Sequence, residues 1–254
     1  MLDAHRLACL EMLGVDVYVR REQPPAVTVG SPAVAPIETT LPETAPPETA
    51  SVPEGGGQVE GNLDWAPLRA MVADCRRCEL HGTRTQTVFG VGSHSARWMF
   101  IGEAPGAEED RQGEPFVGRA GQLLTSMIRA LGYGREQVYI ANILKCRPPG
   151  NRDPKPEEAR SCRGYLERQI ELVSPTLVVA VGRIAAQTLL GTDVTLARLR
   201  GRVHVLGNRR WPLVVTYHPA YLLRSPGEKR KAWQDLLFAR DVYARLSRGE
   251  AVLP

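Results

Sequence analysis

Residues 97–106, RWMFIGEAPG, place a short apolar run directly before a glycine-rich turn. An apolar run of this length that ends in a turn indicates a buried strand. The same pattern recurs at residues 138–144 (VYIANIL), 176–182 (TLVVAVG) and 212–219 (PLVVTYHP). The stretches after these runs have apolar residues at helical spacing, and they predict helices at 121–132, 156–173, 183–191 and 228–246. Strands that alternate with helices predict an α/β fold.

This alternation also predicts where a ligand binds. Right-handed crossovers between the strands give a three-layer α/β/α sandwich around a short, mainly parallel sheet. In such sheets ligands bind beyond the carboxyl ends of the strands. Three polar motifs lie there, namely GEAPG (102–106), ANILKCRPPGNR (141–152) and TYHPA (216–220). We therefore expect one site at this edge.

The charges of the chain are distributed unevenly. Residues 1–60 contain three Arg and nine Asp or Glu, whereas the remainder contains 29 Lys or Arg and 19 acids. A basic domain behind an acidic lead predicts an anionic partner, nucleic acid first among them. No apolar run approaches the roughly 18–20 residues that a membrane span needs, and no secretory signal is recognisable. We expect a cytoplasmic protein without a membrane partner.

The composition divides the chain into three parts. Residues 1–21 predict a short helix followed by a short strand. Residues 22–61 are rich in Pro, Thr, Ala and Glu, and repeated prolines remove backbone donors, so this stretch is predicted to be a disordered linker. Residues 62–254 are expected to form the folded domain. The sequence identifies no partner for the N-terminal arm.

Four of the five cysteines are candidate metal ligands. Cys75 and Cys78 form a CxxC pair, while Cys146 and Cys162 stand alone. An odd count without an export signal disfavours a disulfide framework. Four thiolates bind either zinc or an iron–sulfur cluster, and the spacing by itself leaves both open. Cys9 is interpreted as a small hydrophobic residue of the leading helix.

Four motifs together resemble the family 4 uracil-DNA glycosylases. They are CRRCELHGTR (75–84), GEAPGAEEDRQGEPFVGRAGQLL (102–124), NILKCRPPGNRDPKPEEARSC (142–162) and TYHPAYLLR (216–224). The likeness extends from about residue 63 to 246. It implies a monomeric, monofunctional enzyme that flips uracil out of DNA and hydrolyses its N-glycosidic bond, which leaves an abasic site. It also implies a structural [4Fe–4S] cluster on Cys75, Cys78, Cys146 and Cys162.

The resemblance assigns roles in a uracil pocket. His218 is expected to donate a hydrogen bond to uracil O2, where negative charge grows as the base departs. Asn142 is expected to bind O4 and N3–H, because an amide offers both a donor and an acceptor. Phe116 is expected to stack on the extruded base. The turn that approaches uracil consists of Gly102, Glu103, Ala104 and Pro105.

The residue that places the attacking water is left open. Ala104 stands where the best-known uracil-DNA glycosylases have an aspartate, a difference that family 4 shares. Glu103, Glu109 and Asn151 are the candidates to position water or to offset charge on the sugar. Glu109 could also exclude the methyl group of thymine, and Asp110 is interpreted as its solvated neighbour.

A DNA-contacting segment follows His218. Tyr221, Leu222 and Leu223 are apolar, and Arg224 is cationic. Apolar side chains can enter the minor groove as a wedge while cations bind phosphates, and a base inside a duplex must be flipped out before it can react.

Two alternatives have different outcomes. A related group of proteins traps uracil covalently through an inserted basic loop with a histidine after the GEAPG region, but residues 116–120 continue without an insert. The other alternative is a non-enzymatic nucleic-acid-binding module stapled by zinc.

Overall fold

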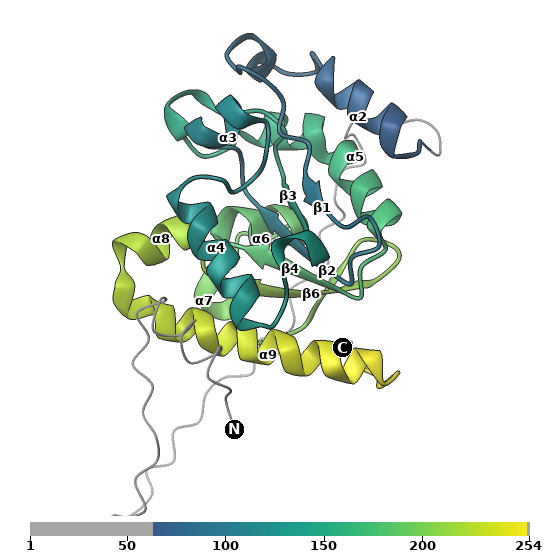
Figure 1. Cartoon of the computed structure of the whole chain (residues 1–254), viewed down its shortest axis with the longest axis vertical. Coiled ribbons are helices and arrows are strands. Elements are labelled where there is room, and N and C mark those ends of the chain that lie inside the picture. Colours follow the sequence, from purple (N-terminus) through teal and green to yellow (C-terminus); the bar gives the residue numbers. More distant parts are fainter. Residues whose placement is uncertain (1–62, 253–254) are drawn as a thin grey trace, which may run out of the picture.

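The computed structural model describes residues 63–252, which form one sheet covered by helices on both faces (Figure 1). The helix and strand predicted in residues 1–21 and the linker predicted in 22–61 lie outside the described residues. No helix within 63–252 is both long and apolar enough to cross a membrane.

The sheet contains the four predicted strands at its centre. Its order is β1-β3-β2-β4-β6-β5, with parallel pairing among β3, β2, β4 and β6 and antiparallel pairing of β1 and β5 at the edges. The mainly parallel sheet is thus confirmed. The two edge strands were not predicted, because they are too short to show a pattern. The strands are β1 (Val91–Gly92), β2 (Trp98–Gly102), β3 (Tyr139–Asn142), β4 (Leu177–Val181), β5 (His204–Leu206) and β6 (Trp211–Thr216).

The predicted helices are present with small shifts at their ends. The α-helices are α2 (Trp65–Ala73), α3 (Ala107–Gln112), α4 (Arg119–Ala130), α5 (Pro156–Val173), α6 (Arg183–Leu190), α7 (Leu196–Leu199), α8 (Pro219–Arg224) and α9 (Lys229–Ser247). The 3₁₀ turns are η1 (Glu79–Gly82), η2 (Arg135–Gln137), η3 (Pro149–Asn151) and η4 (Pro226–Glu228). The α5 helix begins at Pro156, because the first helical position needs no N–H donor.

Alternate residues of the strands enter two separate hydrophobic layers. In β2, Met99 and Ile101 pack in the layer beneath α2, α5 and α6, whereas Trp98 and Phe100 pack in the layer beneath α4, α8 and α9. Because successive side chains point to opposite faces of a strand, β2 packs against an apolar layer on each face, and every one of its residues is buried. The three-layer α/β/α sandwich is confirmed.

The register of the sheet brings the ends of the strands together. Gly102 of β2 pairs with Asn142 of β3, and Val181 of β4 pairs with Thr216 of β6. The segments that follow these residues therefore leave the sheet at the same edge, as parallel strands require. All three polar motifs lie at this edge.

Candidate active site

Asn142 is the last residue of β3, and its side chain is buried beside Gly102. The residue is 2% exposed, and its Oδ1 has no hydrogen-bond partner within residues 63–252. A Cβ atom on Gly102 would lie 2.5 Å from this oxygen and would also collide with the ring of Phe116. Only glycine therefore allows β2, Asn142 and Phe116 to approach so closely. Because buried polar atoms are nearly always bonded, the free oxygen indicates a place for a ligand.

Phe116 lies in the loop between α3 and α4 with its ring turned inward. The residue is 7% exposed, and its φ of 55° is unusual for a side chain of this size. Its ring centroid lies 5.7 Å from that of His218, with the planes tilted by 35°. The ring therefore borders the same space as Asn142 and His218.

Glu109 braces the loop that carries Phe116. Its Oε1 accepts hydrogen bonds from the backbone N–H of Val117 (2.9 Å) and Gly118 (3.0 Å), and its Oε2 accepts one from Gly106 (3.1 Å). Arg135 also binds this loop by donating to the Pro115 carbonyl. Both carboxylate oxygens of Glu109 are engaged with backbone amides, so the contacts support a positioning role.

Asp110 is buried, so its interpretation as a solvated neighbour of Glu109 is wrong. The residue is 3% exposed, and its carboxylate accepts hydrogen bonds from the backbone N–H of Thr85 at 2.9 and 3.1 Å. It therefore anchors the segment after the CxxC pair to α3. The sequence pattern missed this contact because the two segments are distant in the chain.

His218 follows β6 and is held as a neutral imidazole. Its Nδ1 accepts a hydrogen bond from the backbone N–H of Ala220 (3.2 Å), so the ring proton is on Nε2. Burial lowers the pKa of His218 to about 4, with Arg224 lowering it further and Glu109 opposing. A Cβ on Gly182 would lie 2.8 Å from the Cβ of His218, so the glycine at the end of β4 lets the histidine segment pass. His218 therefore offers an uncharged N–H donor at Nε2.

Glu103 lies in the turn after Gly102, near charged groups from the segments that follow β3 and β4. Burial raises the pKa of Glu103 to about 7, with Asp153 raising it and Arg183 opposing. Asp153 and Arg183 form an ion pair of 3.0 Å. Sequence reasoning missed both residues, although Arg183 begins α6 two residues after the end of β4 and the rule on strand ends could have found it.

Asn151 lies in η3, beyond β3, and is exposed. Its Oδ1 accepts a hydrogen bond from Nε of Arg147 (2.8 Å), and its backbone φ is 55°. Ala104 is partly exposed and Pro105 is buried, on the turn between Gly102 and α3. These residues share the carboxyl edge of the sheet with Glu103.

The predicted DNA-contacting segment forms α8 and turns two of its apolar side chains outward. Tyr221 and Leu223 are 38% and 37% exposed, and Arg224 is also exposed. Leu222 is 1% exposed and packs in the layer beneath α4 and α9, so its side chain is not on the surface that Tyr221 and Leu223 share. Residues of one helix point in different directions, and the neighbouring helices bury only this one.

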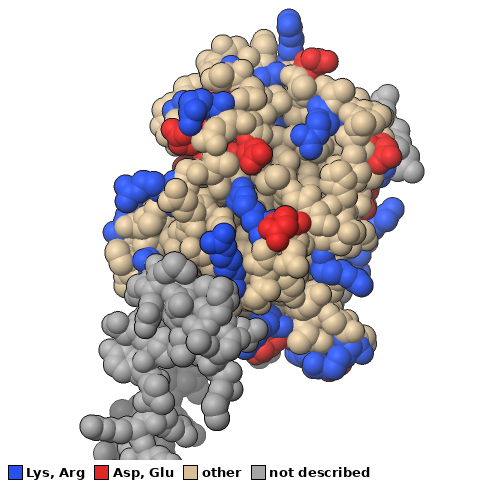
Figure 2. Space-filling model, in the orientation of Figure 1, with Lys and Arg blue, Asp and Glu red and all other residues tan. Residues whose placement is uncertain are grey.

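Tyr221 is supported from behind. The ring of Tyr217 stacks on the ring of Tyr221, with the two centroids 5.4 Å apart. The Arg200 guanidinium lies 4.4 Å from the centroid of the Tyr217 ring. Figure 2 shows basic side chains around the position of α8 and more basic than acidic residues on the visible face. This arrangement provides an exposed aromatic residue within a basic surface.

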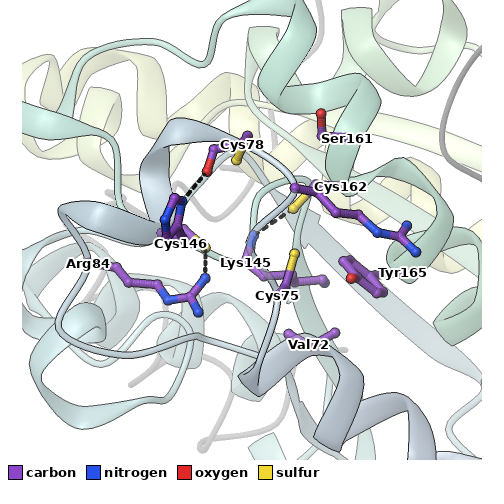
Figure 3. A pocket seen from close by; sticks show the side chains of 11 residues that line it. Val72, Cys75, Cys78, Arg84, Lys145, Cys146, Ser161, Cys162 and Tyr165 are labelled. Carbon is purple, nitrogen blue, oxygen red and sulfur yellow. Dashed lines mark hydrogen bonds between the residues drawn. The ribbon is translucent and has the colours of Figure 1, made fainter.

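The four predicted cysteines line one pocket. Cys75 and Cys78 precede η1, Cys146 follows β3, and Cys162 lies in α5. Figure 3 shows their sulfur atoms around a common space. The Arg84 guanidinium donates to Sγ of Cys146 (3.1 Å), and the Lys145 backbone N–H donates to Sγ of Cys162 (3.4 Å).

The donor set of this pocket fits a thiolate-bound group. Burial raises the pKa of Cys162 to about 12 and also raises those of Cys78 and Cys146, so the buried thiols need a cation to become thiolates. Within residues 63–252, no three His, Cys, Asp or Glu side chains lie close enough together to hold one metal ion. The four cysteine thiols instead line the wall of one shared pocket.

Comparison with known proteins agrees with the resemblance found in the sequence motifs. Residues 89–237 match the uracil DNA glycosylase superfamily. A type-4 uracil-DNA glycosylase from Archaeoglobus fulgidus is 47% identical over 163 residues, which cover 61% of this chain and 81% of that protein. One from Thermotoga maritima is 46% identical over 156 residues, covering 61% of this chain and 80% of that protein. A type-5 uracil-DNA glycosylase from Thermus thermophilus is 35% identical over 116 residues, which cover 40% of this chain and 52% of that protein. The chain belongs to the uracil DNA glycosylase superfamily.

Proposed function

We propose that this chain, a uracil-DNA glycosylase, removes uracil from DNA in base excision repair by hydrolysing the bond from the sugar C1′ to N1 of the base. The observation that carries the proposal is the Oδ1 of buried Asn142, which has no hydrogen-bond partner within residues 63–252 and lies beside Gly102, in a space that Phe116 also borders. Uracil offers a donor at N3 and acceptors at O2 and O4, which match an amide acceptor and neighbouring donors.

Asn142 selects the base in this proposal. Its Oδ1 accepts from N3–H of uracil, and its Nδ2 donates to O4. Cytosine presents an amino donor and a bare N3 at the same edge, which is the wrong pattern for this amide. Discrimination through a buried hydrogen-bonding group is strong, because a mismatched base leaves that group unpaired.

His218 stabilises the departing base. The transition state resembles an oxocarbenium ion, with negative charge growing at O2 of uracil. The neutral Nε2–H donor is already fixed in its tautomer by Ala220, so no proton has to move before the reaction. A donor of this kind contributes about 3 kcal/mol to the transition state.

Phe116 provides the stacking surface, and the turn through Gly102, Ala104 and Pro105 lines the pocket beside it. Glu109 acts by holding Phe116, which its three hydrogen bonds to backbone amides support. Its carboxylate also remains our candidate to exclude the methyl group of thymine.

Glu103 is our first candidate to orient water or to offset positive charge on the sugar. With a pKa of about 7, its carboxyl changes charge near neutral pH, and it lies in the turn directly after Gly102. Asn151 is the second candidate, although its Oδ1 is bonded to Arg147. No lyase step is proposed, because the amine of Lys145 binds the Asn142 carbonyl and Gln169.

Cys75, Cys78, Cys146 and Cys162 are proposed to hold a [4Fe–4S] cluster. When bound, it supplies a covalent cross-link among the CxxC segment, the end of β3 and α5, and base excision needs no redox step. The shared pocket and the two hydrogen bonds to sulfur support this ligand set.

Tyr221, Leu223 and Arg224 are proposed to contact DNA, with Tyr221 or Leu223 entering the space left by the flipped base. The protein is proposed to act as a monomer in the cytoplasm. Against covalent trapping, residues 113–118 alone join α3 to α4, which leaves no room for an inserted histidine loop.

The decisive experiment uses a uracil-containing oligonucleotide with enzyme in excess, followed by alkali to cleave abasic sites. We expect strand cleavage only after alkali and only at uracil. A stable protein–DNA adduct would favour the covalent trap, and tight binding without either product would favour the zinc module.

A further inference from the structure

Lys145 places an ammonium group in the interior of the domain. The residue is 1% exposed, and its Nζ donates to the carbonyl oxygen of Asn142 (3.0 Å) and to Oε1 of Gln169 (2.6 Å). Both acceptors are neutral. An ammonium buried among neutral groups is costly unless negative charge lies nearby.

The same residue touches the cysteine pocket. Its backbone N–H donates to Sγ of Cys162 at 3.4 Å, Cys146 is the next residue, and Lys145 lines the pocket with all four thiols (Figure 3). Four thiolates that bind a cluster give the pocket a net negative charge, which is the countercharge that the buried ammonium requires.

On its other side, Lys145 holds the end of β3. The ammonium bonds the carbonyl of Asn142, the residue from which the uracil-reading amide projects. The next N–H groups, of Ile143 and Leu144, bond the carbonyls of Gly102 (2.9 Å) and Glu103 (3.1 Å). Lys145 thus bonds the carbonyl of the same peptide whose N–H donates to Gly102.

Gln169 fixes the ammonium in place. While its Oε1 accepts from Lys145, its Nε2 donates to the Phe89 carbonyl (2.9 Å) and to the Tyr139 hydroxyl (3.2 Å). Gln169 is fully buried in α5, about two turns after Cys162 on the same face of the helix. The helix that carries a cysteine therefore also positions the lysine.

We propose that Lys145 is a positioning residue that couples the four-cysteine site to Asn142. This inference rests on the proposed function, in which Asn142 reads uracil and the cysteines hold a cluster. Lys145 joins the two sites by contact: its backbone N–H donates to Sγ of Cys162, and its ammonium donates to the carbonyl of Asn142 and so keeps that peptide oriented. Loss of this bond misplaces the amide, and a displacement of about 1 Å at a reacting site costs on the order of 100-fold in rate.

Lys145→Met tests the coupling, because methionine fills similar space without charge. Lys155→Met is the matched control, since it removes the same charge from a side chain that is 47% exposed. We expect both variants to keep the wild-type iron content. Lys145→Met should lower the single-turnover rate on uracil DNA about 10- to 100-fold and shift the reduction potential of the cluster to a more negative value. Lys155→Met should change neither.

A double-mutant cycle with Asn142→Ala shows whether Lys145 acts through Asn142. If it does, adding Lys145→Met to Asn142→Ala lowers the rate much less than it lowers that of the wild type. Additive losses, or an unchanged potential in Lys145→Met, overturn the coupling. An unchanged rate in Asn142→Ala alone would instead refute the proposed function.

If Lys145→Met does not fold, Gln169→Glu decides the question in the same cycle. This change keeps the lysine and the side-chain size but gives the ammonium its own carboxylate. We expect slower excision that is not additive with Asn142→Ala, and a more negative potential. A wild-type rate and potential in Gln169→Glu overturn the proposal.

Discussion

The imidazole of His218 and the phenyl ring of Phe116 are neighbours, with centroids 5.7 Å apart and planes tilted by 35°. They come from opposite ends of the domain sequence, one after β6 and the other between α3 and α4. A base that stacks on Phe116 therefore lies beside the Nε2–H donor of His218. In the proposed function, stacking by Phe116 and stabilisation of charge by His218 therefore come from two neighbouring loops.

Replacing His218 should affect the chemical step and leave the choice of base unchanged. Because the residue is proposed to donate to the charge on O2, His218→Ala should lower the single-turnover rate on uracil about 100-fold, as expected for about 3 kcal/mol. Uracil and cytosine oligonucleotides with enzyme in excess measure rate and selectivity together. A wild-type rate in this variant would remove His218 from the pocket assignment.

The pH dependence should reflect a histidine that is neutral in the folded protein. Its pKa is lowered from 6.5 to about 4, so the unfolded state binds a proton that the folded state does not. This contribution to stability is full above pH 6.5 and is lost as the pH falls toward 4. We expect His218→Gln to flatten the change in unfolding free energy between pH 6.5 and 4, measured by denaturant titration. An equal slope in both proteins contradicts the buried neutral form.

Glu103 should make stability change with pH in the opposite direction. Its pKa is raised from 4.5 to about 7, so the folded state holds a proton that the unfolded state releases, and stability falls as the pH rises from 4.5 to 7. If its carboxylate assists the reaction, the excision rate rises through pH 7, and Glu103→Gln removes that rise. Rate profiles from pH 5 to 9 for both proteins test this role, with Glu108→Gln, an exposed carboxyl of α3, as control.

Base choice should depend on the hydrogen-bonding pattern of Asn142. Asn142→Asp should weaken excision of uracil and admit cytosine, since a protonated or reoriented carboxyl matches the amino edge. Oligonucleotides with uracil, cytosine or thymine at one position measure the change. Selectivity that is the same as in the wild type would show that another group reads the base.

Loss of one cysteine ligand should remove the iron. Protein purified without oxygen should be brown, with about four irons per chain. Cys146→Ala should lose the colour and destabilise the domain, because its buried sulfur joins β3 to the other ligands. Cys9→Ala, outside the described residues, is the control and should keep both. One zinc and no iron, in protein made with ample iron, would overturn the cluster assignment.

The central strands and long helices were predictable because their signals are local. The apolar runs of β2 and β4 need burial on both faces, and Pro156 begins α5 where the helical periodicity begins. The carboxyl-edge rule then placed Asn142 and His218 at one edge without knowledge of any contact. Periodicity and strand order follow from backbone hydrogen bonding and side-chain polarity, which are written in consecutive residues.

Long-range contacts decided the rest. Leu222 and Tyr221 are neighbours in sequence, and only packing against α4 and α9 buries the first and exposes the second. The pKa of Glu103 depends on its burial and then on Asp153 and Arg183, which lie in segments that follow other strands. The bonds of Lys145 depend on Gln169 of α5. Local sequence determines which elements form, whereas the burial and charge around each side chain exist only after distant segments have packed together.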